Sequence, residues 1–390
     1  MQKIPATSGV KRVALVLPAA RVLGGTAGTL LSEIRDRRHR ALVLAPDWSD
    51  ATRAAAAAFG AETEAFPLKG EGPRAFADFA TVHVLARRLE EFNPHAVAGF
   101  GAKAALLAAL AARGLNNAEV ISIIGAGDAM FGPPGADAGN AARPDARWQR
   151  LARRGFAASG GIVVASEEAR RRLRSLDLAD RASPITTLPS SGVDLAAFAA
   201  SPLPPLDDGP VFLLIERAGD GEAAARFEDA AARIRAEAAP SRFHALPSAG
   251  AATEPPPAPP RPGRTVRQRH VERLDAATEL ASAVTAAHVV VIASAADGFP
   301  PGALEALALA RPLVIADGAF AREIVDDRVN GCLFSGTEPA ALADAMAVFV
   351  RRPDLIAAMG RASRLKAERR FDERRIAADL LGLLGVARAA

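Results

Sequence analysis

The sequence predicts an α/β protein with two doubly wound parallel-sheet domains. Apolar runs of strand length alternate with helical segments, and this alternation occurs twice along the 390 residues, which is typical of parallel sheets covered by helices. Between the two series lies a proline-rich stretch, 201–210, with the composition of a linker. We therefore expect an N-terminal domain over 1–200 and a second domain over 201–371, each large enough to bury its own core.

The first domain is predicted to begin with a strand over 10–17, a helix that ends near Arg38 and a second strand over 41–45. Gly24 and Gly25 form the turn between the first strand and the helix. Glycine is a common residue where a chain turns sharply between two elements. The segment therefore indicates a βαβ unit with a glycine turn at its mouth.

Two more patterns of strand, turn and helix follow in this domain, over 94–107 and from residue 119 onward. The helix of the first pattern contains Lys103. The strand of the second pattern ends at a turn that contains Gly125 and Gly127. Both patterns continue the alternation that predicts a parallel sheet.

Residues 132–145 are rich in Gly, Pro, Ala and Asp and lack apolar periodicity. They predict either a loop over a cleft or a plain surface insertion. A strand over 162–166 and an arginine-rich helix complete the first domain. In the second domain, residues 254–263 predict an extended proline-rich loop.

The second domain opens with a strand over 211–215, which is followed closely by Arg217. Further on, a buried strand predicted over 288–294 runs into a Gly/Pro turn and a helix. This segment carries two carboxylates, Asp297 and Glu305, eight residues apart. A carboxylate in the turn and another in the helix can contact the same small molecule, and ligands of open α/β sheets bind at this carboxyl edge.

The segment that follows this strand resembles the E-x7-E signature of retaining GT-B glycosyltransferases of the family-four type, with Asp297 where the family usually has Glu. Further stretches are similar to other motifs of the family: 188–198, 306–317 and 322–331. The resemblance implies a GT-B fold, in which two Rossmann-like domains face a cleft. It also implies that the last helix, about 372–390, crosses back onto the first domain.

The resemblance implies a function as well. The expected reaction moves a sugar, with retention and without a metal ion or a separate cofactor, from a nucleotide sugar to a saccharide or lipid-linked saccharide. A UDP-sugar is the expected donor. The segments 94–107 and 119–127 resemble the acceptor-side half of glycosyltransferases that act on lipid-linked saccharides in bacterial capsular and exopolysaccharide pathways, so we expect a role in surface polysaccharide synthesis.

The same resemblance assigns the site residues. Asp297 and Glu305 are the expected catalytic residues, with Asp297 on the hydroxyls of the sugar and Glu305 on those of the ribose. The remaining residues fall into three groups: Arg217, Gly24 and Gly25 near the donor diphosphate; Gly298, Phe299 and Pro300 at the diphosphate or the sugar; and Lys103, Gly125 and Gly127 on the acceptor side.

Several of these residues also have a plain structural interpretation. Asp297 could cap the following helix, and Glu305 could be a solvated helix glutamate. Arg217 could be a surface arginine after a strand, and the pair Gly24 and Gly25 could form an ordinary turn.

Three positions depart from the family's pattern. Glu222 stands in the register of a lysine that, with an arginine, holds the donor diphosphate in the family; Ile124 stands where Thr or His is usual; and Asp297 replaces Glu. These departures support a competing hypothesis, a catalytically weakened GT-B protein that binds a saccharide or a partner glycosyltransferase. We favour the enzyme, because both carboxylates are kept and Arg273 or Lys103 could supply another cation.

Composition limits the class and the location of the protein. The net charge is +4, the pI is about 9.8 and the arginines occur in clusters. These clusters could form a basic face that binds anionic lipid or a lipid-linked acceptor. Alternatively, the arginines only keep the exposed faces of helices solvated. No basic segment is interleaved with aromatic residues, which argues against nucleic acid. The single cysteine and the lack of a long apolar run predict a cytoplasmic protein. The arginine clusters predict that it associates reversibly with the inner face of the membrane.

Other enzyme classes find no support in the sequence. The six histidines and one cysteine do not have metal-ligand spacings. Neither a P-loop nor a G-x-S-x-G nucleophile turn occurs. We therefore expect no metal site.

Overall fold

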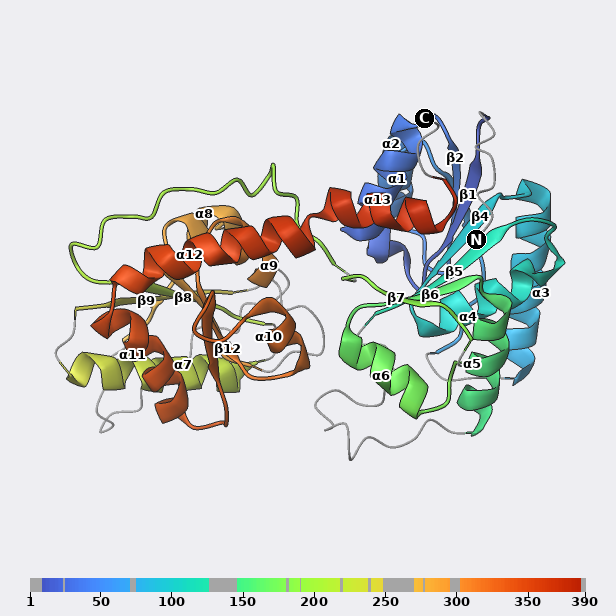
Figure 1. Cartoon of the computed structure of the whole chain (residues 1–390). Coiled ribbons are helices and arrows are strands. Elements are labelled where there is room, and N and C mark those ends of the chain that lie inside the picture. Colours follow the sequence, from blue (N-terminus) through green and yellow to red (C-terminus); the bar gives the residue numbers. More distant parts are fainter. Residues whose placement is uncertain are drawn as a thin grey trace, which may run out of the picture. The chain divides into compact units, whose positions relative to one another are not determined.

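The computed structural model describes residues 9–386 except 24, 71–74, 126–145, 180–181, 190, 218–219, 238–239, 248–269, 276–277 and 295–301. The chain forms two compact units, which Figure 1 shows in sequence colours. Unit 1 consists of Met1–Gly192 and Glu373–Ala390, and unit 2 of Val193–Asp372. The loops predicted at 132–145 and 254–263 lie outside the described residues.

Unit 1 contains a parallel sheet of seven strands in the order β3-β2-β1-β4-β5-β6-β7. The strand order reverses direction between β1 and β4, as in doubly wound sheets. The strands are β1 (Arg12–Val16), β2 (Arg40–Ala45), β3 (Glu62–Ala65), β4 (Ala96–Phe100), β5 (Glu119–Ile124), β6 (Gly161–Val164) and β7 (Ile185–Thr187).

Helices cover both faces of this sheet (Figure 1). On one face lie α1 (Thr26–Asp36), α2 (Asp50–Ala58) and the last helix of the chain, α13 (Glu373–Leu383). On the other lie α3 (Ala75–Phe92), α4 (Ala102–Ala111) and α5 (Ala146–Ala158), with α6 (Glu167–Ser175) beside β6 and β7. Short 3₁₀ helices, η1 (Ala20–Leu23) and η2 (Ala112–Gly114), join some elements. The apolar face of α13 packs on α1 through Ile376 and Leu380, so the end of the chain belongs to the core of unit 1.

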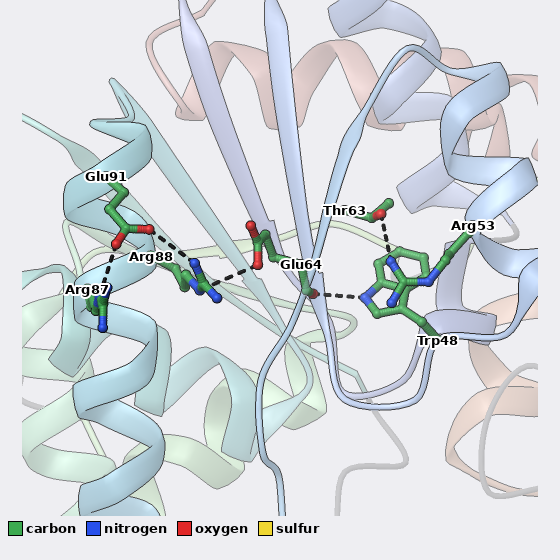
Figure 2. A network of polar contacts seen from close by, with 7 residues as sticks. All are labelled: Trp48, Arg53, Thr63, Glu64, Arg87, Arg88 and Glu91. Atoms are coloured by element: carbon green, nitrogen blue, oxygen red, sulfur yellow. Dashed lines mark hydrogen bonds and ion pairs between the residues drawn. The ribbon is translucent and has the colours of Figure 1, made fainter.

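Polar contacts attach the edge strand β3 to α2, to the segment just before α2 and to α3 (Figure 2). The indole of Trp48 donates to the carbonyl of Glu64 at 2.8 Å, and Arg53 donates to Thr63 Oγ1 at 3.1 Å. Arg88 of α3 reaches the Glu64 carboxylate at 3.4 Å. Exposed pairs of this kind contribute little stability, but charged side chains on an edge strand hinder pairing with the edge of another sheet.

Unit 2 contains a second parallel sheet, with the strand order β10-β9-β8-β11-β12-β13. The strands are β8 (Val211–Ile215), β9 (Arg242–Leu246), β10 (Glu272–Arg273), β11 (Val289–Ile292), β12 (Leu313–Ala316) and β13 (Gly331–Phe334). Every residue of β8, β11 and β12 is buried. Such continuous apolar strands are expected in a parallel sheet that is covered on both faces.

The helices of unit 2 again lie on both faces (Figure 1). Helices α7 (Gly221–Ala236) and α11 (Pro339–Arg351) pack on one face, and α8 (Leu280–Thr285) and α9 (Ala303–Ala308) on the other. The unit also contains α10 (Ala319–Ile324) and α12 (Asp354–Lys366), which contacts α9 and continues into a π-helical turn, η4 (Ala367–Phe371).

The structure confirms the predicted fold class, two α/β units that each hold a doubly wound parallel sheet. The strand predicted over 211–215 has those same bounds, and the strand predicted over 10–17 is present over Arg12–Val16. Among the described residues, every helix is too short or too polar for a membrane span.

Arg311 is the largest fully buried side chain of the described residues. Its guanidinium donates to the carbonyls of Ser201, Pro202, Thr285, Ala287 and Leu309 and to the Ser201 hydroxyl, at 2.7–3.1 Å. Burial lowers the pKa of Arg311 to about 10, so the side chain remains charged at neutral pH. Carbonyl oxygens thus compensate a buried cation and hold the beginning of the 201–210 stretch against the sheet.

We expect Arg311→Lys to lower the free energy of unfolding of unit 2 by about 2–4 kcal/mol, because lysine keeps the charge but loses the planar fork, which leaves buried carbonyls without a donor. Denaturant unfolding measures the change. Arg351→Lys, at an exposed ion pair with Glu237, is the matched control and should change the stability by less than about 0.5 kcal/mol. Equal effects of the two substitutions would contradict the structural role of Arg311.

Candidate functional site

A pocket of about 640 Å³ lies at the carboxyl edge of the unit 2 sheet. Its lining comes from the segments that follow β8, β11, β12 and β13 and from the first turns of α7. Open α/β sheets bind ligands at this edge. The lining residues are Arg217, Asp220, Glu222, Arg226, Ser294, Ala316, Asp317, Phe334, Gly336 and Thr337.

The start of α7 contributes side chains of both charges to the pocket. Asp220 is the N-cap, and its carboxylate accepts the amide of Ala223 at 3.2 Å, which is the usual role of Asp at this position. Arg217 and Glu222 are exposed. Arg217, which is predicted to bind phosphate, and Glu222, which replaces the family's lysine, therefore line the same pocket.

Sequence reasoning missed the second cation of this pocket, Arg226. Its Nε donates to the carbonyl of Thr337 at 2.9 Å, and its Nη1 donates to the carbonyl of Ala293. These carbonyls follow β13 and β11, so α7 is fixed to two strand ends. The only signal in the sequence was the spacing of four residues from Glu222, which places both side chains on one face of a helix.

The negative charge of Asp317, which directly follows β12, is compensated by side chains of the fold. Both oxygens of its carboxylate accept from Arg322 at 2.7 Å, and the Ser335 hydroxyl donates to it at 3.3 Å. The hydrogen bonds from Arg322 hold the pKa of Asp317 below its usual value. The carboxylate of Asp317 is therefore ionised but paired.

Glu305 lies in the first turn of α9 and is partly buried. Burial raises its pKa, although the backbone amides of Glu305 and Gly302 favour the charged form. The carboxylate is therefore not fully solvated, which does not favour the interpretation as a solvated helix glutamate. Because α9 begins at Ala303 with Gly302 as its N-cap, the interpretation of Asp297 as that cap is wrong. Asp297 itself and the turn Gly298, Phe299 and Pro300 lie outside the described residues.

Gly302 sets the position of α9 beside β8. Its φ of 80° lies in the left-handed region, and a Cβ there would lie 2.2 Å from Cδ1 of Ile215. Any other residue there would have a strained backbone, and the side chain of Ile215 would have to move. Since β8 and β11 are neighbours in the sheet, Arg217 and Glu305 follow the carboxyl ends of adjacent strands.

The sequence suggested Arg273 and Lys103 as cations that could replace the missing lysine at the diphosphate, but both side chains have partners within the fold. Arg273 forms an ion pair with Glu216. Lys103 is buried, its ammonium lies 2.8 Å from the Asp78 carboxylate, and it donates to the carbonyls of Lys69 and Gly70 at 2.8 and 3.2 Å. Lys103 therefore ties segments of unit 1 together, which does not favour its predicted role on the acceptor side.

Of the other predicted residues of unit 1, Gly25 and Gly125 are described, and both lie at turns of the sheet. Gly25, with a φ of 65°, is the N-cap of α1, and Gly125 follows β5; Gly24 and Gly127 are outside the described residues. Ile124 is fully buried in a core cluster that contains Trp148 and Phe156, so it does not face a ligand. The departure from Thr or His at this position therefore falls within the core of unit 1.

No group of three or more His, Cys, Asp or Glu side chains in the described part of the chain could hold a metal ion.

Comparisons with known proteins agree with this architecture. The family described as "Glycosyl transferase 4-like domain" matches residues 24–190, and the family described as "Glycosyl transferases group 1" matches residues 210–351. Thus each unit carries the domain of one glycosyltransferase family model. No curated protein matches the sequence.

Several solved structures share the fold. A glycosyltransferase from Rickettsia africae is 13% identical with a TM-score of 0.71, over 97% of this chain and 98% of that one. Anabaena HepE in complex with UDP and glucose is 16% identical with a TM-score of 0.67, over 96% and 99%. Sucrose-phosphate synthase from Thermosynechococcus elongatus is 14% identical with a TM-score of 0.65, over 96% and 98%.

The paired parallel sheets and the pocket at a carboxyl edge define a GT-B type protein. With both of its domains matched in order, the chain belongs to the GT-B glycosyltransferases of the family-four type.

The raised pKa of Glu305 predicts a pH-dependent cost in stability. The folded protein holds the proton of Glu305 more tightly than the unfolded chain does. The contribution of this group to the free energy of unfolding is therefore largest below its ordinary pKa of 4.5, and it is lost as the pH rises through the pKa of the folded state. We expect Glu305→Gln to be more stable than the wild type at about pH 7 without ligand, and the difference to shrink towards about pH 4. Unfolding at several pH values measures this.

The matched control is Glu237→Gln, which neutralises an exposed carboxylate at the end of α7. It should show no comparable gain at neutral pH. If Glu305→Gln were the less stable protein at neutral pH, the charged form of Glu305 would be stabilised in the fold, against the direction inferred here.

Proposed function

We propose that the protein is a retaining, metal-independent glycosyltransferase that moves a sugar from a nucleotide sugar to a saccharide or lipid-linked saccharide. The observation that carries the proposal is the position of Arg217 and Glu305 after adjacent strands of unit 2, with Arg217 lining a pocket of about 640 Å³. A cation for phosphate and a carboxylate for ribose hydroxyls are what a nucleoside diphosphate requires.

The proposed roles follow from the chemistry of each group. Arg217 binds the diphosphate, Glu305 accepts hydrogen bonds from the ribose, Asp297 binds hydroxyls of the sugar, and the turn 298–300 lies at the diphosphate or the sugar. In the reaction the bond from the sugar to the diphosphate breaks, and the sugar forms a bond to an acceptor hydroxyl. Positive groups at the leaving diphosphate lower the barrier, because they offset its developing charge. Activity should then persist in EDTA.

The UDP, glucose and UDP-glucose in the HepE structures support a UDP-sugar as the donor. We propose that unit 1 binds the acceptor, with Gly125 and Gly127 on the acceptor side and Gly24 and Gly25 near the donor diphosphate. We also propose that the acceptor belongs to bacterial surface polysaccharide synthesis in the cytoplasm.

A catalytically weakened binding protein is the second candidate. It is favoured by Glu222, an exposed carboxylate that lines the pocket at the position of the family's lysine. A carboxylate beside a diphosphate is repulsive. Binding of nucleotide without turnover of any nucleotide sugar would select this candidate over the enzyme.

Glu305→Ala should weaken binding of the donor nucleotide by about ten- to a hundredfold, because a charged hydrogen bond contributes roughly 1.5–3 kcal/mol. Asp297→Ala should leave the binding of free nucleoside diphosphate unchanged and lower turnover of the nucleotide sugar, whereas Asp297→Glu should keep activity. A thermal-shift screen with UDP, GDP and ADP identifies the nucleotide, and calorimetry then compares the variants.

Glu237→Ala is the matched control on α7 and should bind the nucleotide like the wild type. If Glu305→Ala bound the nucleotide as tightly as this control, the assignment of Glu305 to the donor site would be wrong.

We further propose reversible association with anionic membrane through α6. Arg170, Arg171 and Arg174 of this helix surround a hollow of about 740 Å³ on unit 1. Basic residues near an anionic surface contribute about 1 kcal/mol each. The double substitution Arg170→Gln and Arg171→Gln should therefore reduce co-sedimentation with phosphatidylglycerol vesicles by about tenfold or more. Phosphatidylcholine vesicles and high salt are the controls, and binding that ignores both lipid charge and salt would refute this association.

A further inference from the structure

The donor pocket contains a cation that the family's sequence pattern does not assign. The pattern asks for a lysine at position 222, and this chain has Glu222 there. Arg273 is paired with Glu216, and Lys103 is tied to Asp78 inside unit 1. Among the described lining residues of the pocket, the cations are Arg217 and Arg226.

Arg226 lies one helical turn after Glu222, on the same face of α7. Side chains of an α-helix lean toward its N-terminus, so a long side chain covers the turn that precedes its own Cα. The guanidinium of Arg226 accordingly lines the pocket together with Glu222 and Arg217. It therefore reaches the region that a shorter lysine at position 222 would occupy.

The orientation of Arg226 is fixed before any ligand binds. Its Nε and Nη1 donate to the carbonyls of Thr337 and Ala293, which come from two different strand ends. These bonds use two of the five N–H groups of the guanidinium. Among the described residues, Nη2 has no hydrogen-bond partner, and one hydrogen of Nη1 also remains. An arginine held in this way loses little entropy when it binds phosphate, and its planar fork matches two phosphate oxygens.

We propose that Arg226 is the second cation of the donor diphosphate site and takes the place of the lysine that is absent at position 222. This inference rests on the proposed function. Arg217 and Arg226 bind the diphosphate from two sides of the start of α7, and Arg226 offsets charge on the leaving group as the bond to the sugar breaks. Glu222 is exposed and turns toward solvent when the diphosphate binds.

Calorimetry with UDP, GDP, ADP and their nucleosides tests the proposal. Arg226→Gln should weaken binding of the preferred nucleoside diphosphate by about ten- to a hundredfold and change binding of the matching nucleoside by less than about threefold. Arg226→Lys should fall between wild type and Arg226→Gln, because it keeps the charge without the fork. The matched control is Arg233→Gln, which removes the same charge from an exposed position of the same helix and should bind like the wild type.

A rescue experiment separates a binding role from a purely structural one. Adding Glu222→Lys to Arg226→Gln should restore diphosphate affinity by about tenfold or more, since a cation returns to the same region. Equal diphosphate affinity in Arg226→Gln and Arg233→Gln would overturn the inference, as would a loss of equal size for nucleoside and diphosphate. A wild-type protein that binds none of the three diphosphates would instead overturn the proposed function, and the inference with it.

Discussion

The site in unit 2 depends on one constraint, the parallel direction of all six strands of the sheet. Because parallel strands end at the same edge, segments that are far apart in the sequence meet there. Arg226 thus bonds carbonyls that lie 67 and 111 residues further along the chain. The same edge holds the beginnings of α7 and α9, which bring Arg217 and Glu305 after neighbouring strands.

Four basic side chains, Arg311, Lys103, Arg217 and Arg226, divide into two kinds by what compensates them. Arg311 and Lys103 are buried, and backbone carbonyls or a carboxylate satisfy their donors; they stabilise the fold. Arg217 and Arg226 line a pocket, and Arg226 keeps donors without partners among the described residues. Since a buried cation needs acceptors from the fold itself, only the second kind is suited to a ligand.

Glu305 shows a conflict between stability and function. Its burial raises the pKa and disfavours the charged form, and Gly302, with its left-handed backbone, precedes α9 beside Ile215. A protein selected only for stability would have no reason to keep a carboxylate there. A ribose whose hydroxyls donate to that carboxylate would offset the cost of its burial, which links the first turn of α9 to binding.

The sequence by itself determined the class of fold and the position of Arg217. The unbroken apolar run of β8 specifies a buried parallel strand, and its Arg217 follows within two residues, so local pattern suffices. Only the tertiary structure decided that Ile124 belongs to the core, that Lys103 forms an ion pair with Asp78, and that Arg226 lines the pocket. The physical reason is that burial and hydrogen-bond partners come from residues distant in the chain, and no local pattern of sequence contains them.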